Sequence, residues 1–219
     1  MARPPRGQHS AYTYHVLNRG NGGATVFHKD GDYGAFLDLL ATAKCKFPVK
    51  LFSFCVMPSH FHVVLQPVTD KALSSFMRWW QTSYARWYHQ HHRSRGHLWQ
   101  GRFRSFPIQQ DGHFLTVVRY VLCNPIRAGL VQRIDQWPWS SRQQQAHLDP
   151  WPVELPRDWD QWAETPLFDH ELAGIRTSVN RQAPFGAPQW QEQTAKTLGL
   201  ASTLNPCGRP RKDSSRKGE

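Results

Sequence analysis

Apolar positions in the first 125 residues recur with two different periods, and these periods predict a series of strands and helices. Strands are expected at 11–19, 49–57, 60–67 and 102–109, and helices at 32–45, 71–92 and 111–125. The order β-α-β-β-α-β-α predicts an α+β fold of the ferredoxin-like, split β-α-β kind with an antiparallel sheet. We expect the helices to pack on one face of this sheet, which would leave the other face free for a ligand.

The pattern weakens after Gly129. The stretch "WPWSS" (137–141) predicts the start of a short helix, and 149–166 is rich in Pro, Trp and acidic residues, as expected of a segment that wraps a surface. The stretch "APQWQEQTAKTLGL" (187–200) predicts a further helix, with Pro188 near its start and Gly199 at its end. We therefore divide the chain into 1–134, an acidic segment 135–175 that wraps the surface, and a C-terminal helical extension 176–219.

Composition predicts a globular cytoplasmic protein. The 219 residues are 39% hydrophobic, which is enough for one sizeable domain. No run approaches the roughly 18 apolar residues of a membrane span, and "MARPPRGQHS" lacks the apolar stretch of a secretory signal. The four cysteines at 45, 55, 123 and 207 form no CxxC pair, which argues against a disulfide framework or a cysteine zinc site.

Charge is segregated along the chain. The net charge is +11, yet residues 71–110 carry seven basic residues and no acid, while 135–171 carry eight acids and two basic residues. Aromatic residues are interleaved with the arginines of 71–110, and arginines with flat rings suit phosphates and unstacked bases. This pattern favours a nucleic-acid-binding face associated with the nucleoid; an ordinary solvated basic surface is the alternative.

The stretch "HFHVVLQP" places two histidines on one face of an expected strand. Residues i and i+2 of a strand project to the same side, so His60 and His62 point one way while Phe61 points into the core. Two neighbouring imidazoles can chelate a divalent metal ion. The alternative is that both histidines lie incidentally on a polar face.

The expected helix 111–125 carries a second set of candidates. Tyr120 and Asn124 are four residues apart and share a helix face, with Arg119 beside them as a phosphate contact. A tyrosine can act as a covalent nucleophile. Equally, Tyr120 could be a core ring, and Asn124 could cap the helix that begins at Pro125.

Five motifs occur in a fixed order: "MPSHFHVVL", "LWQGRFRS", "RYVLCNPIRAGLV", "WPWSS" and "PFG…W…LGL…GRPRK". Together they resemble the REP-associated tyrosine transposases of the HUH superfamily, which have the IS200-like transposase fold. The resemblance extends from "YHVLNRG" to the C-terminal tail.

The resemblance implies a role for each candidate. It makes 1–134 the HUH catalytic domain, with the catalytic helix after the fourth strand, and 176–219 a DNA-contacting extension. It makes Tyr120 the nucleophile that forms a 5′-phosphotyrosine, and His60 and His62 ligands of Mg²⁺ or Mn²⁺. Asn124 stands where related transposases place a third ligand, often a glutamine, and here it directly precedes Pro125.

The implied partners are single-stranded DNA and short REP-like palindromes folded into hairpins. Expected DNA contacts, with Arg102 and Arg104 facing the same way, are Asn18, Arg19, Arg78, Trp99, Arg102, Arg104, Arg119, Arg127, Arg209, Arg211 and Lys212. The last three belong to "GRPRK", which resembles an arginine hook for the minor groove, although Cys207 replaces its first arginine. A plain basic tail is the alternative for that stretch.

Two other classes compete with a cutting transposase. One is a domesticated regulator that binds DNA hairpins without cutting; the presence of His60, His62 and Tyr120 argues against lost chemistry. The other is a replication initiator or relaxase with the same strand motif, but such proteins tend to be longer. The short link from the fourth strand to residue 111 favours a monomer over a homodimer, with the site completed within one chain.

Overall fold

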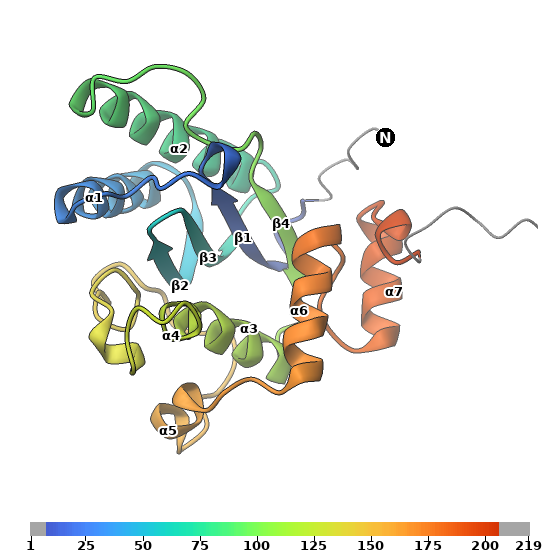
Figure 1. Ribbon diagram of the computed structural model, residues 1–219. Helices are drawn as coiled ribbons and strands as arrows, with labels where there is room; N and C mark the ends of the chain where they lie inside the picture. Colours follow the sequence, from blue (N-terminus) through green and yellow to red (C-terminus); the bar gives the residue numbers. More distant parts are fainter. Residues whose placement is uncertain (1–7, 206–219) are drawn as a thin grey trace, which may run out of the picture.

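A four-stranded antiparallel sheet forms the centre of the computed structural model, which describes residues 8–205 (Figure 1). The strands are β1 (Thr13–Arg19), β2 (Val49–Met57), β3 (His60–Pro67) and β4 (Arg104–Ile108). The helices are α1 (Asp30–Lys46), α2 (Ala72–His91), α3 (Gly112–Leu122), α4 (Asn124–Arg127), α5 (Trp159–Glu164), α6 (Asp169–Arg181) and α7 (Pro188–Thr197), with 3-10 turns at Asn21–Gly23, Ile134–Gln136 and Ala201–Thr203. The strand order β2-β3-β1-β4 confirms the predicted split β-α-β fold.

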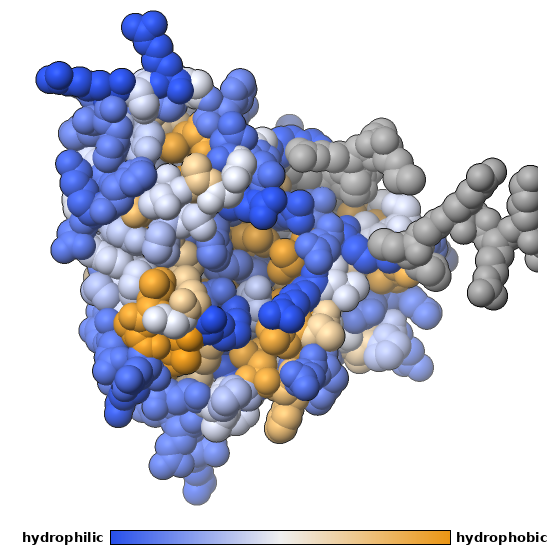
Figure 2. All heavy atoms as spheres, in the orientation of Figure 1, coloured by the Kyte–Doolittle hydropathy of each residue, from blue (hydrophilic) through white to orange (hydrophobic). Residues whose placement is uncertain are grey.

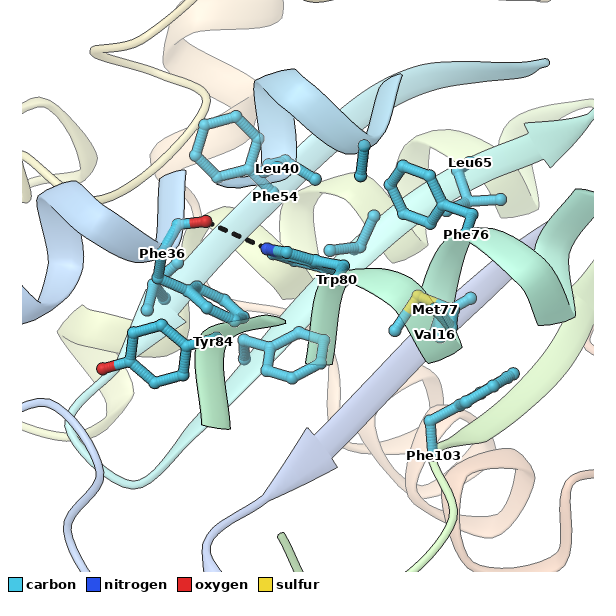
Figure 3. Close-up of a cluster of buried hydrophobic side chains, with 14 of the residues drawn as sticks. Val16, Phe36, Leu40, Phe54, Leu65, Phe76, Met77, Trp80, Tyr84 and Phe103 are labelled. Atoms are coloured by element: carbon cyan, nitrogen blue, oxygen red, sulfur yellow. Dashed lines mark hydrogen bonds between the residues drawn. The ribbon is translucent and has the colours of Figure 1, made fainter. Parts of the chain in front are cut away.

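One face of the sheet packs against α1 and α2. Strand residues such as Val16 and Phe61 meet a cluster of buried aromatic rings around Trp80, whose Nε1 donates a hydrogen bond to the carbonyl oxygen of Phe36 at 2.9 Å (Figure 3). Phe61 is fully buried, as its place between the two histidines predicts. The layer of α1 and α2 thus packs against the face of β3 opposite to the two histidines.

The prediction that the other face stays free is wrong, because α3 packs across it with α6 beside it (Figure 1). Val64 and Phe106 of the sheet contact Phe114, Val117 and Val121 of α3 in a second buried cluster. Strands β2 and β3 are buried almost throughout, and a strand covered on both faces has a continuous apolar run rather than an alternating one. The runs "FSFCVM" and "VVL" carry that signal.

Segments from the C-terminal half of the protein cover both edges of the sheet. At the β2 edge, Val56 N donates to Trp139 O and Ser141 N to Phe54 O, both at 2.9 Å. The predicted helix at "WPWSS" is therefore wrong: this stretch satisfies the unpaired backbone groups of an edge strand instead. At the β4 edge, Phe185 exchanges two backbone hydrogen bonds with Pro107 and Gln109.

The segment 149–166 packs closely against the domain. The Trp151 indole contacts the ring of Phe114 and donates to the carbonyl oxygen of Phe52 at 3.0 Å. The division at residues 134 and 175 stays a prediction. Among the described residues, none of the helices has the length and apolar character that a membrane crossing needs.

The face shown in Figure 2 is mostly hydrophilic, and its hydrophobic residues gather in the region of α3 and α4. The large hydrophobic residues that are exposed in the described part of the chain are Val68, Leu130, Leu155 and Phe168. Leu130 follows α4 directly. The helix that carries Tyr120, α3, therefore lies in the more apolar region of this face.

Candidate functional site

His60 and His62 lie side by side on the sheet face that α3 covers. Their ring centroids are 5.0 Å apart and the rings are perpendicular. His60 is the first residue of β3 and follows the turn at Pro58, whereas His62 is only 3% exposed. The strand period thus places both imidazoles on one side, as the sequence predicts.

Tyr120 of α3 lies against these histidines. Its ring makes an edge contact with His62 at a centroid distance of 5.7 Å, and 9% of the residue is exposed. The structure therefore brings together a phenol and two imidazoles that are about sixty residues apart in sequence, all within one chain.

A third histidine, His15 of β1, joins the cluster and was not predicted. Its Nε2 is 2.9 Å from Nδ1 of His62, and the two rings stack at 5.0 Å. Because Nδ1 of His62 is occupied by this hydrogen bond, Nε2 is the nitrogen of His62 that remains for a ligand. The only sequence signal was a lone histidine in "YHVLNR", whose pairing with β3 depends on a long-range register.

The three imidazoles are neutral at neutral pH. Burial lowers the pKa of His15 to about 3 and that of His60 to about 4, and it lowers the pKa of His62 well below the ordinary value. The positive charge of Arg127 adds to each of these shifts. Neutral imidazole is the form that binds metal ions, so the donor chemistry of His60 and His62 fits a divalent cation.

Asn124 and Arg127 form a hydrogen-bonded unit at the end of α3. Asn124 Nδ2 donates to the carbonyl oxygens of Tyr120 and Val121, at 3.0 and 3.3 Å. Its Oδ1 accepts from Arg127 Nη2 at 2.7 Å, so the amide oxygen predicted to bind a metal ion is occupied here by a cation. Among residues 8–205, no group of three or more His, Cys, Asp or Glu side chains could hold a metal ion. The fit of the site to a metal ion therefore depends on the two imidazoles.

Arg119 is buried and paired in this structure, which does not favour its predicted role as a phosphate contact. The residue is 1% exposed, its Nη2 donates to Glu171 of α6, and its guanidinium lies 4.0 Å from the ring centroid of Trp162. Its neighbour Tyr120 points to the sheet, whereas Arg119 points to the acidic C-terminal segment. Arg119 thus ties that segment to α3.

Asn18 and Trp99 are also buried, so the structure does not favour direct DNA contacts by their side chains. Asn18 Nδ2 donates to Gln81 and to the carbonyl oxygen of Gly101. Trp99 is 9% exposed, and its Nε1 donates to Gln81 O at 3.2 Å. Both residues fasten the loop 96–103 to the core.

The remaining predicted arginines on described residues lie at the surface. Arg19, Arg78, Arg102, Arg104 and Arg127 are exposed. Arg78 and Arg102 line a pocket of about 960 Å³ between α2 and the loop 96–103, together with Asp70, Lys71, His97 and polar residues of α2. Arg104 instead faces α6, where its Nη1 donates to Val179 O at 3.4 Å. The prediction that Arg102 and Arg104 face in the same direction is therefore wrong.

The end of β1 connects the loop 96–103 to the strand that carries the histidine pair. Arg19 pairs in register with His60, and its carbonyl oxygen accepts a hydrogen bond from Gln100 of the loop at 2.9 Å. Arg19 Nε also donates to the Gln100 side chain. Arg209, Arg211 and Lys212 lie outside the described residues.

Known proteins resemble this chain in sequence and in fold. The family model described as "Transposase IS200 like" matches residues 8–124. A Haemophilus influenzae protein assigned to the REP-associated tyrosine transposases is 27% identical over 52% of this chain and 68% of its own length. The REP-associated tyrosine transposase of Escherichia coli is 25% identical over 51% of this chain and 65% of its own length.

A solved structure of a REP-associated tyrosine transposase bound to a REP hairpin has the same fold. It superposes with a TM-score of 0.57 at 19% identity, over 76% of this chain and 95% of the other. The region it covers extends beyond the residues that the family model matches.

Proposed function

The chain belongs to the transposase IS200-like family, and on that basis we propose that it cuts and rejoins single-stranded DNA beside REP-type hairpins through a covalent bond to Tyr120. The observation that carries this proposal is the position of the Tyr120 ring beside His62, itself next to His60, within one chain.

The proposed reaction is a transesterification at one phosphodiester. Tyr120 Oη attacks the phosphorus atom and releases its proton to water, the bond from phosphorus to the 3′ oxygen breaks, and that oxygen takes up a proton. The products are a 5′-phosphotyrosine and a free 3′-hydroxyl. Attack by a 3′-hydroxyl on the phosphotyrosine reverses the step and reseals a strand without ATP.

His60 and His62 would hold the Mg²⁺ or Mn²⁺ ion that the family implies. When bound, such an ion polarises the phosphate that the tyrosine attacks. Imidazole ligands suit Mn²⁺ better than Mg²⁺, which prefers oxygen ligands. His15 would fix the ring of His62 through their 2.9 Å hydrogen bond, as outer-shell partners do in other metal sites.

The basic pocket between α2 and the loop 96–103 is the proposed contact for the DNA strand beside the hairpin stem. Arg78 and Arg102 supply positive charge there, and the exposed Arg19, whose carbonyl oxygen accepts from Gln100 of the loop, pairs with His60 in the sheet. The exposed charges favour phosphate binding, and the pocket is large enough for unstacked bases.

We propose that the site works within one monomer. The described chain supplies both histidines and the tyrosine, and the C-terminal half covers both sheet edges, through Trp139 at β2 and Phe185 at β4. Those edges are the surfaces through which two sheets would otherwise join.

The test is cleavage of a REP-type hairpin oligonucleotide with single-stranded flanks, in the presence of Mn²⁺. Tyr120→Phe should abolish both cleavage and the covalent adduct seen on a denaturing gel, while hairpin affinity stays nearly unchanged. Tyr88→Phe, a tyrosine of α2 outside the site, is the matched control and should cut normally. His60→Ala or EDTA should also abolish cutting. If Tyr120→Phe cuts at the wild-type rate, the assignment of the nucleophile is wrong; if the wild type binds hairpins but never cuts, the protein is a non-cutting regulator.

A further inference from the structure

The Arg127 side chain packs against the ring of the proposed nucleophile, Tyr120. Its guanidinium carbon lies 4.1 Å from the centroid of the Tyr120 ring. Nη1 donates to the carbonyl oxygen of Tyr120 at 3.1 Å, and Nη2 donates to Asn124 Oδ1 at 2.7 Å. Three contacts thus fix one flat cation over one face of the phenol ring.

This arginine has an exposed surface and no carboxylate partner. The ion pairs of residues 8–205 do not include Arg127, whereas Arg119, eight residues earlier, is paired with Glu171. A guanidinium has five N–H donors, and the described contacts use two of them. The others are available to an anion that approaches Tyr120.

The Asn124 amide holds this cation in place. Its Nδ2 group is bound to the last carbonyl oxygens of α3, so its Oδ1 points in a fixed direction toward Arg127. Asn124 therefore links the end of the catalytic helix to the guanidinium, and its oxygen is not free for a metal ion in this arrangement.

We propose that Asn124 and Arg127 act as one unit, in which Asn124 positions the guanidinium and Arg127 binds the phosphate that Tyr120 attacks. This inference depends on the proposed function and assigns Asn124 a role different from that of a third metal ligand. Arginine binds phosphate oxygens through two parallel hydrogen bonds, and these bonds strengthen as negative charge grows on the oxygens during attack. Arg127 is then a catalytic residue and Asn124 a positioning residue.

Single-turnover cleavage at saturating protein separates catalysis from DNA binding. Arg127→Ala should slow cleavage about 100-fold or more, the usual effect of losing one donor to a developing oxyanion, and should change hairpin affinity far less. Free guanidinium ion, well below denaturing concentrations, should restore much of the lost rate in Arg127→Ala, whereas equal urea should not. Rescue of this kind requires a vacant cation site and is not expected from a purely structural defect. Arg133→Ala, which removes an exposed arginine paired with Asp135, is the matched control and should cut normally.

Asn124→Ala distinguishes a positioning residue from a metal ligand. Mn²⁺ affinity, measured alone from the electron paramagnetic resonance signal of the free ion, should be unchanged in Asn124→Ala and strongly reduced in His60→Ala. Cleavage by Asn124→Ala should be slow. An equal loss of Mn²⁺ affinity in both variants would overturn the role given to Asn124.

Cleavage at the wild-type rate by Arg127→Ala would overturn the role of Arg127. So would slow cleavage by an Arg127→Ala protein that melts normally but that guanidinium ion fails to rescue. Arg127→Lys covers the case in which the alanine variant does not fold, since it keeps the charge but loses the two-pronged geometry; slow cleavage by a folded Arg127→Lys supports the role and wild-type cleavage contradicts it. If Tyr120→Phe cuts while Arg127→Ala does not, the proposed function has failed independently of this inference.

Discussion

Glu171→Ala should destabilise the protein more than Arg119→Met, because the two members of this ion pair differ in their access to water. The Arg119 side chain is 2% exposed and that of Glu171 is 17% exposed. Removing the carboxylate leaves a buried cation without a charged partner, which typically costs about 3–5 kcal/mol. That is a large part of the roughly 5–15 kcal/mol that stabilises a folded domain.

Arg119→Met removes the cation itself and should cost much less. The methionine side chain can still pack on Trp162, and the Glu171 carboxylate can hydrate while it continues to accept the backbone N–H of Phe168 at 2.8 Å. The expected loss is about 1 kcal/mol, near the upper end for exposed ion pairs. The double variant should be more stable than Glu171→Ala alone, because it no longer buries an unpaired charge.

Urea unfolding followed by tryptophan fluorescence measures these free energies. If Glu171→Ala costs no more than Arg119→Met, or the double variant is no more stable than Glu171→Ala, the pair is not buried as the structure describes. The same Arg119→Met protein tests whether Arg119 contacts DNA. Its hairpin affinity should keep the wild-type salt dependence, whereas losing a phosphate contact lowers the slope of log K against log salt by about 0.9. Arg102→Ala, in the exposed basic pocket, is the comparison that should lower it.

Three further predictions concern other parts of the chain. Tyr84→Phe should leave the free energy of unfolding unchanged or raise it by about 1 kcal/mol, because the Tyr84 hydroxyl is buried without a hydrogen-bond partner among the described residues (Figure 3). Burial also raises the pKa of the Tyr84 phenol above its ordinary 10.0, so the phenol ionises at lower pH in the unfolded chain than in the folded protein. The melting temperature should therefore fall less above pH 10 in Tyr84→Phe than in the wild type. An identical fall in both proteins would refute this. His15→Ala should lower Mn²⁺ affinity about 10–100-fold, since His15 orients His62, and calorimetry that shows unchanged affinity would contradict that role. Removing 205–219 should weaken hairpin binding and flatten its salt dependence if the basic tail touches DNA; no change in either would mean that the tail does not contribute.

Local periodicity was enough to predict the elements of the catalytic half and the faces of its key residues. The expected strand at 60–67 agrees with β3, and the period of two placed Phe61 in the core with His60 and His62 opposite. Helix spacing likewise put Asn124 close to Tyr120, although α3 ends at Leu122 and Asn124 begins α4. These relations hold within a single element, where a few neighbouring residues define the geometry.

Relations between elements needed the tertiary structure. His15 reaches His62 only because β1 pairs with β3 in one register, and no local pattern specifies that register. Asn18, Trp99 and Arg119 all suit DNA by residue type, yet the packing of α2, α5 and α6 buries them. Arg119 is buried because α5 and α6 pack over it, whereas Arg102 is exposed because no segment of residues 8–205 covers it in the same way.

The sequence by itself determined the order of strands and helices, the family, and the presence of a histidine pair and a tyrosine suited to the same chemistry. Only the tertiary structure decided that α3 covers the face expected to be free, that Arg127 and not Arg119 lies over the Tyr120 ring, and that Asn124 turns its oxygen toward that arginine. The physical reason is that side-chain direction follows from backbone periods over a few residues, whereas burial and pairing depend on contacts between segments far apart in the chain.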